Sequence, residues 1–334
     1  MKDIILYITE ELRKNIKEFS DNVLVIADYF LEKIDWLKPD KKQHFLTRLS
    51  LCKDIEVDWD KNECMESVKG EIKEVMHLIK DKKWDEVIEN YVCRPYKGSK
   101  KKIYNFLTTL KEEEAKKYVC YGHLMNTIDI IERNVSLEFI KDCIPFLNQI
   151  LDLSYLMELH RSDVCNVKDN CGTIYINFIG SLRSLLEPFF HSSNPNVENL
   201  WRDSRMYYIT KPFTQSNLYA VTHTIINESH FYTKKVDQND YRKEVEYIDR
   251  WLTRARQNYY RVPSLDLLCE AALCEKFVDK DNFVEWKYVN KFLQTKVSSN
   301  THILQSNNDY LDNKKDNLNK NEHTNILYIL LNKL

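Results

Sequence analysis

The chain has 334 residues, a length that suits one large domain or two packed helical halves. It contains 5 Gly and 7 Pro, too few turn residues for a many-stranded fold, and this scarcity favours helices. The formal net charge is −2 with acidic and basic residues interleaved, which argues against a nucleic-acid partner held by neutralisation of its phosphates.

The cysteines and the N-terminal segment indicate a reducing, non-membrane setting. The nine cysteines are scattered and include no Cys-x-x-Cys pair, so reduced, buried thiols are expected rather than a cysteine zinc site. The charged pair Glu10 and Glu11 follows the first apolar residues too closely for a signal-peptide core, and no uncharged apolar stretch approaches about 18 residues. We therefore expect a cytoplasmic protein with no membrane partner.

Apolar residues recur every three or four positions through most of the chain, the spacing of amphipathic helices. Prolines at positions 39, 95 and 212 interrupt this period, because the residue before a proline is pushed out of the helical region. The segments in which helices are expected are 3–36, 40–53, 60–92, 103–161, 172–190, 196–209, 215–232, 238–259, 264–278 and 281–295.

These elements predict an all-α fold of helical hairpins, packed as an α/α toroid-like or solenoid-like domain. Residues 1–165 are expected to form an N-terminal helical half and residues 166–297 a C-terminal half. Residues 298–323 are rich in Asn, Asp, Lys and Ser, a composition that predicts a flexible polar linker. The apolar residues of 324–334 predict a short C-terminal helix.

The densest group of reactive side chains lies in the segment from Tyr219 to Tyr232. On one helix, Tyr219, His223, Ile226 and His230 would form a stripe with Thr222 beside it, and this stripe could line a cavity. An unperturbed imidazole titrates near pH 6.5, so His223 is the candidate general acid or base and Tyr219 would orient it. The sequence is equally consistent with a structural role, in which His223 is a core histidine hydrogen-bonded to a neighbouring residue. The expected substrate-binding residues are Thr222, Ile226, His230 and Tyr232.

Two acidic residues, Asp266 and Glu270, occupy positions i and i+4 of an otherwise apolar segment and therefore need partners. Either could pair with His223 as a histidine–carboxylate couple, which makes both catalytic candidates. Pairing with arginines of the preceding helix is the more frequent structural arrangement.

A metal site is the weaker alternative. Glu187 and His191 share a helix face, and His223, Glu228 and His230 could complete a carboxylate–histidine set, but the two Glu-x-x-His pairs of helical di-iron proteins are missing. No metal is therefore predicted and no cofactor is assigned. The chain also lacks a glycine-rich phosphate loop, a Gly-x-Ser-x-Gly elbow and a His-Glu-x-x-His motif, which disfavours nucleotide hydrolysis and ordinary serine or zinc hydrolysis.

Residues 217–226 and 265–270 resemble a bacterial family of uncharacterised helical proteins with a Tyr-Ala-x-Thr-His core and a later Asp-Leu-x-x-Glu. The resemblance covers roughly residues 135 to 280. The family's pattern continues into an Asp-Phe-Gly that this chain lacks after Tyr232. The resemblance implies helical hairpins around a cavity, and members look like accessory proteins of peptide or natural-product pathways.

Together these features predict a tailoring or accessory enzyme that binds a small molecule or peptide between helices and uses a histidine–carboxylate pair. A partner enzyme of the same pathway is a second kind of expected partner. The alternative is a non-catalytic helical scaffold that binds a peptide or protein in a groove.

Overall fold

The structure is a computed structural model that describes residues 23–55, 57, 195–261, 264–298, 303–305 and 314–334, with single positions between 70 and 86 and between 172 and 183. The chain forms two compact units. The first, unit 1, combines Met1–Trp59 with Asp237–Leu334, and the second, unit 2, is Asp60–Val236. The two ends of the sequence thus share one unit.

The N-terminal part of unit 1 is helical at 23–32 and continues through the 3-10 turn η1 (Ile34–Trp36) into α2 (Pro39–Leu49). Pro39 opens α2, where its missing N–H removes no helical hydrogen bond, and the preceding Lys38 is extended. The helix break predicted at this proline is therefore confirmed. Phe30 and Phe45 stack with ring centroids 4.8 Å apart and join the two helices.

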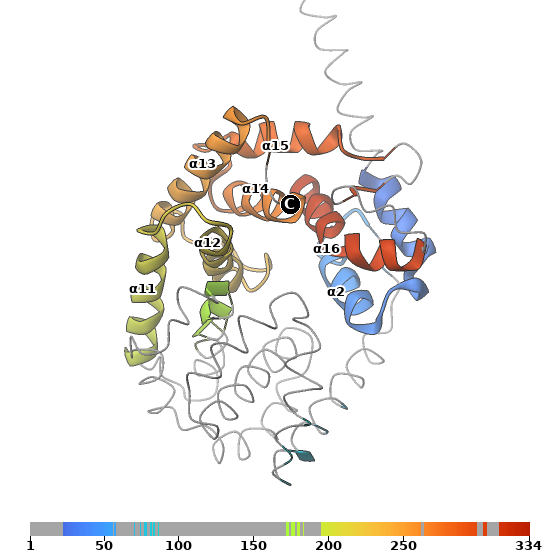
Figure 1. Ribbon diagram of the computed structural model, residues 1–334, viewed down its shortest axis with the longest axis horizontal. Helices are drawn as coiled ribbons and strands as arrows, with labels where there is room; N and C mark the ends of the chain where they lie inside the picture. Colours follow the sequence, from blue (N-terminus) through green and yellow to red (C-terminus); the bar gives the residue numbers. More distant parts are fainter. Residues whose placement is uncertain are drawn as a thin grey trace, which may run out of the picture. The chain divides into compact units, whose positions relative to one another are not determined.

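The centre of unit 1 is α14 (Leu265–Asp279), which packs against α13 (Arg242–Gln257), α15 (Glu285–Gln294) and α16 (Lys314–Lys333) (Figure 1). Its residues from Leu267 to Glu275 are all buried. A helix that is apolar nearly all round needs cover on several faces, and the three neighbouring helices supply it.

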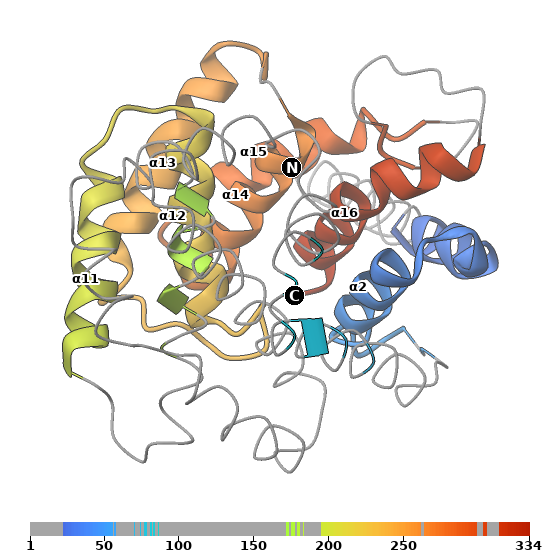
Figure 2. The ribbon, with the colours of Figure 1, turned by 60° about the horizontal axis from the view of Figure 1, so that its bottom comes forward.

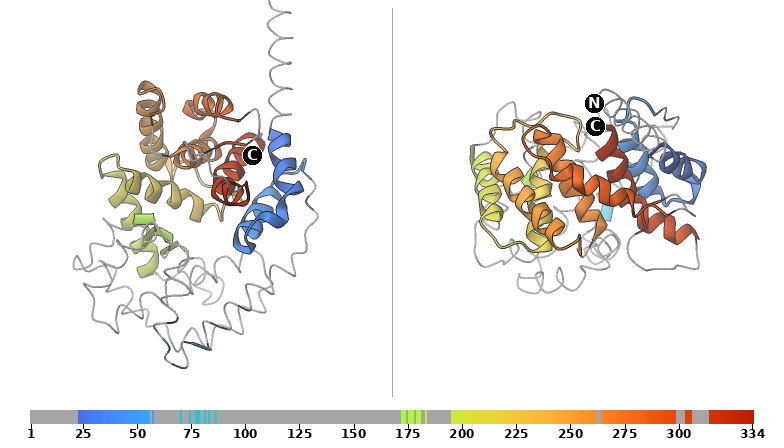
Figure 3. Two further views of the ribbon diagram at one scale, coloured as in Figure 1. Left: turned by 45° about the vertical axis from the view of Figure 1, so that its right-hand side comes forward. Right: turned by 90° about the horizontal axis from the view of Figure 1, so that it is seen from above.

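The C-terminal helix α16 packs against both α14 and α2, and Figure 2 shows α2 beside it. In Figure 3, α16 is the red helix between the blue N-terminal helices and the orange α14. It begins at Lys314, so it includes positions of the expected 298–323 linker as well as the expected 324–334 helix. Leu318 and the run from Ile326 to Leu331 are buried, so packing of these side chains stabilises the helix.

Unit 2 is described through α11 (Pro195–Ile209), α12 (Gln215–Glu228) and helical positions between 172 and 183. α11 and α12 pack against each other. A Cβ atom on Gly172 would lie 3.1 Å from Ala220 Cβ and from the Tyr208 ring, so this glycine lets its helix approach both.

The all-α fold class is confirmed, and the described residues contain no strand beyond one isolated bridge between Val297 and Leu304. The toroid-like or solenoid-like arrangement and the halves 1–165 and 166–297 stay predictions. Cys52, Cys269 and Cys274 are buried free thiols, as expected. Within the described part of the chain, no helix is long and apolar enough to cross a membrane.

Candidate functional site

His223 lies on α12 in a hydrogen-bonded group of unit 2. Its Nδ1 atom is 2.7 Å from Asn177 Oδ1, which also accepts a hydrogen bond of 2.9 Å from Asn227 Nδ2. Because an amide oxygen only accepts, Nδ1 of His223 is the protonated nitrogen, and Nε2 keeps the lone pair that a base needs. The Asn227 amide also donates to His223 O, at 2.7 Å, and so links ring and backbone.

The position of Asn227 depends on Gly180. A Cβ atom at position 180 would lie 2.7 Å from Asn227 Cγ and Oδ1, closer than real Cβ atoms approach. Glycine is therefore required where its helix passes the amide. Neither Asn177 nor Gly180 was a candidate from the sequence. The helical spacing of apolar residues does not reveal that Asn177 contacts His223, which lies 46 positions away.

The other candidate site residues of α12 differ in how far they are buried. Tyr219 lies next to His223, with ring centroids 6.5 Å apart in an edge-on arrangement. Thr222 and Ile226 are buried, at 0% and 4% exposed, and Thr222 Oγ1 donates to Tyr219 O. Glu228 forms an ion pair with Arg183. Tyr219 and His223 are thus partly exposed, whereas Thr222 and Ile226 are buried.

His230 does not continue this stripe, which corrects the single helix expected over 215–232. α12 ends at Glu228, and His230, Phe231 and Tyr232 have φ angles of 47°, 57° and 69°. The left-handed backbone region costs a non-glycine residue about 1–2 kcal/mol. Ser229 supports the turn, because its Oγ accepts from the Tyr232 N–H at 3.0 Å and the Tyr232 ring is buried.

Asp266 does pair with a histidine, but the described partner is His323 of α16, at 2.5 Å from Nδ1 to Oδ1. Glu270, buried on the same face of α14, adds its negative charge near this ring. Arg256, one of the arginines considered as a partner, instead binds Glu285 through two bonds of 2.8 Å. His223 belongs to unit 2, and its pairing with Asp266 or Glu270 stays a prediction.

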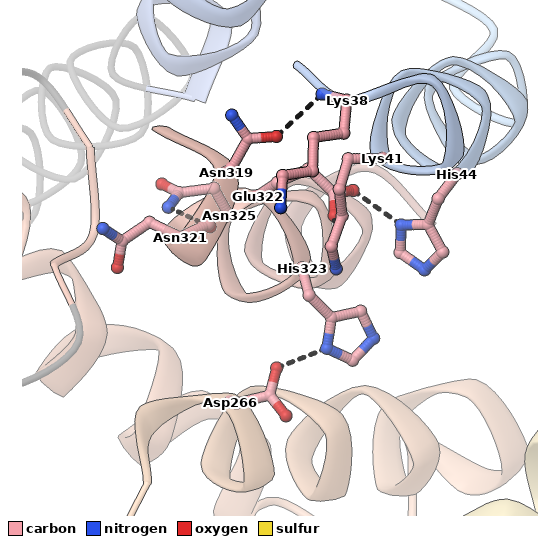
Figure 4. Close-up of polar contacts among 9 residues, drawn as sticks. All are labelled: Lys38, Lys41, His44, Asp266, Asn319, Asn321, Glu322, His323 and Asn325. Atoms are coloured by element: carbon pink, nitrogen blue, oxygen red, sulfur yellow. Dashed lines mark hydrogen bonds and ion pairs between the residues drawn. The ribbon is translucent and has the colours of Figure 1, made fainter. Parts of the chain in front are cut away.

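A second histidine–carboxylate couple lies beside the first (Figure 4). His44 Nδ1 of α2 is 2.6 Å from Oε1 of Glu322, whose other oxygen is 3.3 Å from Lys41 Nζ. The rings of His44 and His323 have centroids 5.1 Å apart. In each couple the carboxylate is hydrogen-bonded to Nδ1 of the imidazole. Figure 4 shows the second ring nitrogen, Nε2, pointing away from that carboxylate.

The two rings experience opposite electrostatic effects. Burial, reinforced by the charge of Arg48, lowers the pKa of His44 below its usual range despite Glu322. Burial also opposes a charge on His323, but the Asp266 carboxylate outweighs it and raises the pKa of that ring. The side chains are 23% and 32% exposed, so solvent moderates both effects. At neutral pH, His44 is neutral and His323 is the ring that favours a proton.

Glu322 is ionised in this arrangement although its side chain is fully buried. Burial alone would raise its pKa, but His44 and Lys41 more than compensate and lower it. A buried carboxylate that stays charged can hold the Nδ1 proton of a neighbouring imidazole and fix its tautomer. His44 then presents Nε2 as a proton acceptor.

Little in the sequence marks His44, Glu322 and His323 as members of one site. His44 is separated from Glu322 by 278 positions, and the latter two stand in the segment expected to be a linker. One available signal was an acidic residue directly before a histidine, Glu322-His323, one turn before a fully apolar run. A helix that begins before this apolar run, as α16 does, contains both side chains.

No metal centre replaces these couples among the described residues, where no group of three or more His, Cys, Asp or Glu side chains could hold a metal ion. Glu187 and His191, the weaker metal candidates, lie outside the described residues. Searches of protein-family models, of curated proteins and of solved structures each found no match to this chain.

Proposed function

We propose that the protein is an enzyme that acts by general acid–base catalysis, with the couples His44–Glu322 and His323–Asp266 as its proton-transferring groups. The observation that carries the proposal is the pair of adjacent imidazoles whose surroundings shift their pKa values in opposite directions. Two neighbouring titratable groups with separated pKa values are the pattern from which acid and base are assigned in known enzymes.

In this mechanism neutral His44 accepts a proton at Nε2 while Glu322 stabilises the charge that appears on the ring. Protonated His323 donates its Nε2 proton to the group that gains negative charge, and Asp266 holds the ring in place. Lys41 keeps Glu322 ionised. The substrate class remains the one expected from the sequence, a small molecule or peptide of a bacterial natural-product pathway.

The protonation states are tested by following the ring nitrogens of His44 and His323 by NMR across pH. His323 should bind its proton with a pKa above 6.5 and His44 with one below it, and at pH 7 His44 should carry its proton on Nδ1. Asp266→Asn should lower the pKa of His323, because the charge that favours its proton is removed. Two rings that titrate together near 6.5 would refute the assignment of acid and base.

The catalytic role is tested by untargeted comparison of metabolites in the native host with the wild-type chain, His44→Gln or His323→Gln. Each substitution should remove the same product and leave the fold intact by circular dichroism. Lys333→Gln is the matched control, because it breaks an ion pair of α16 with Asp54 without touching either imidazole. If it has the same effect, the couples serve only to hold α16, and the proposal fails.

A second candidate is the His223 site, favoured by the hydrogen bond that fixes the tautomer of this ring and by the adjacent Tyr219. His223→Ala in the same metabolite comparison distinguishes the candidates. Product loss with His223→Ala but not with the His44 or His323 variants would move the chemistry to α12. No metabolite change with any of the three would favour the non-catalytic scaffold.

A further inference from the structure

The charged side chains between the middle of α13 and the end of α15 are sorted by burial. Asp281 is the one acidic side chain that the described residues of 250–296 expose. The exposed basic side chains of the same range are Arg250, Arg254, Arg256, Arg261, Lys280, Lys287, Lys291 and Lys296. The surface of this range is therefore basic.

Most of the acidic residues in this range are withdrawn from the surface, because Asp266 and Asp279 are half-buried and the three glutamates are buried. Glu270, Glu275 and Glu285 are 1%, 0% and 6% exposed. The near-zero net charge of the chain thus hides a local excess of positive charge at the surface. A cluster of exposed cations releases counterions when it binds a polyanion, whatever the net charge of the whole molecule.

Two tyrosines are exposed in this basic surface. Tyr259 is 84% exposed and has a φ of 53°, so neither burial nor backbone preference explains an aromatic residue there. Tyr288 is 48% exposed, and the guanidinium of Arg256 lies 4.5 Å from its ring centroid. The bidentate pair with Glu285 holds that guanidinium in place.

The two tyrosines belong to one surface. The Tyr259 N–H donates to Arg256 O at 2.9 Å, one turn from the guanidinium that covers Tyr288. The next residue, Tyr260, stacks on Phe292 of α15 at 4.3 Å and joins the ends of the two helices. Lys287 and Lys291 flank Tyr288 on the exposed side of α15.

We propose that this surface, formed by Arg256, Tyr259, Arg261, Lys287, Tyr288 and Lys291, binds single-stranded nucleic acid. Bases would stack on the two tyrosine rings while the lysines and Arg261 contact phosphates, the combination that holds unpaired strands without base-specific hydrogen bonds. An acidic peptide would use the positive charge but has no flat bases for the exposed rings, so the tyrosines favour nucleic acid. This surface is separate from the residues of the proposed acid–base chemistry.

The test is fluorescence anisotropy of the full chain with a labelled oligouridylate of about twelve nucleotides, a length within the range of single-strand sites. Binding should weaken steeply with salt. Tyr259→Ala and Tyr288→Ala should each reduce affinity by about tenfold, as expected for the loss of one stacked base. Lys291→Gln should weaken binding and lower the slope of the salt dependence by about one.

Matched controls outside the surface are Tyr29→Ala, whose ring also lies beside a cation, Lys33, and the exposed Lys53→Gln. Both should bind as the wild type does. Absence of binding at low salt would overturn the proposal. Equal binding of polyglutamate, unaffected by the tyrosine substitutions, would also overturn it in favour of an acidic protein partner. His44→Gln and His323→Gln should leave binding unchanged, so failure of the catalytic proposal is distinguishable.

Discussion

At the scale of single residues, Glu275 shows how one buried carboxyl group couples this fold to pH. It lies on α14, fully buried, and its Oε1 accepts a hydrogen bond of 3.1 Å from the Trp286 N–H in the first turn of α15. No side chain at the N-cap of α15 makes a capping bond, so Glu275 satisfies one of the open N–H groups from another helix. Among the residues that the structure describes, its Oε2 has no hydrogen-bond partner.

Burial raises the pKa of Glu275 to about 8, and the charges of Asp249 and Glu285 act in the same direction. The folded state therefore holds this proton more tightly than the unfolded chain, in which the carboxyl titrates near its ordinary value of 4.5. The stability that this carboxyl group contributes is fully present below the unfolded pKa and is lost as pH rises from about 4.5 to about 8.

Glu275→Gln should remove most of the stability loss at high pH, because the amide keeps an oxygen that accepts from the Trp286 N–H and has no proton to release. Urea unfolding at pH 5 and pH 9 measures the effect. We expect the variant to be more stable than the wild type at pH 9, by on the order of a few kcal/mol, and close to it at pH 5. Asp281→Asn, at an exposed position, is the control. A wild-type stability that does not decline across this range contradicts the prediction.

At the scale of elements, α16 is fixed by asparagines as well as by apolar packing. Asn325 is fully buried; its Oδ1 accepts from Leu304 N–H at 2.8 Å and its amide donates to Leu304 O at 2.9 Å. Asn319 repeats the arrangement nearer the surface, accepting from Lys38 N–H and donating to Trp36 O. In each loop, one asparagine side chain thus bonds a backbone N–H and a backbone C=O, the two groups that a neighbouring strand would bond in a sheet.

Replacing these two asparagines should have unequal effects. Asn325→Ala leaves the Leu304 N–H without a partner in the interior, which should cost about 1–3 kcal/mol of unfolding free energy. Asn319→Ala breaks the same two types of bond where water can replace them, so its cost should be well below 1 kcal/mol. Chemical denaturation of both variants measures the difference. Equal losses would show that burial of the amide does not matter.

At the scale of the whole molecule, the two ends of the chain complete one unit. η1 and α2 pack with α16, although most of the intervening sequence belongs to unit 2. Deleting residues 314–334 should therefore remove the partner of α2 and one cover of α14. Hydrogen exchange should show loss of amide protection in α2 and α14 with protection retained in α11 and α12. Deletion of the exposed Leu334 alone should change neither. Unaltered protection of α2 after the longer deletion contradicts the prediction.

The periodic helices were predictable, whereas the joins between distant segments were not. α11, α13, α14 and α15 begin and end within a few residues of their expected limits, because apolar residues recur in each of them at helical spacing. Residues 324–334 were expected to be helical, but the first turns of α16 were expected to belong to a linker, because their many Asn, Asp and Lys residues are typical of one. Asp266 was identified as a candidate residue, but its partner His323 comes from that helix and so was missed.

The return of the chain to its starting unit also has a consequence during synthesis. Helix α2 leaves the ribosome long before α16, which packs against it. At about 5–20 residues per second, the emerging segment waits for tens of seconds with Phe45, Leu46 and Leu49 lacking their final cover. A chaperone or a temporary contact would shield that apolar face until α16 has been made.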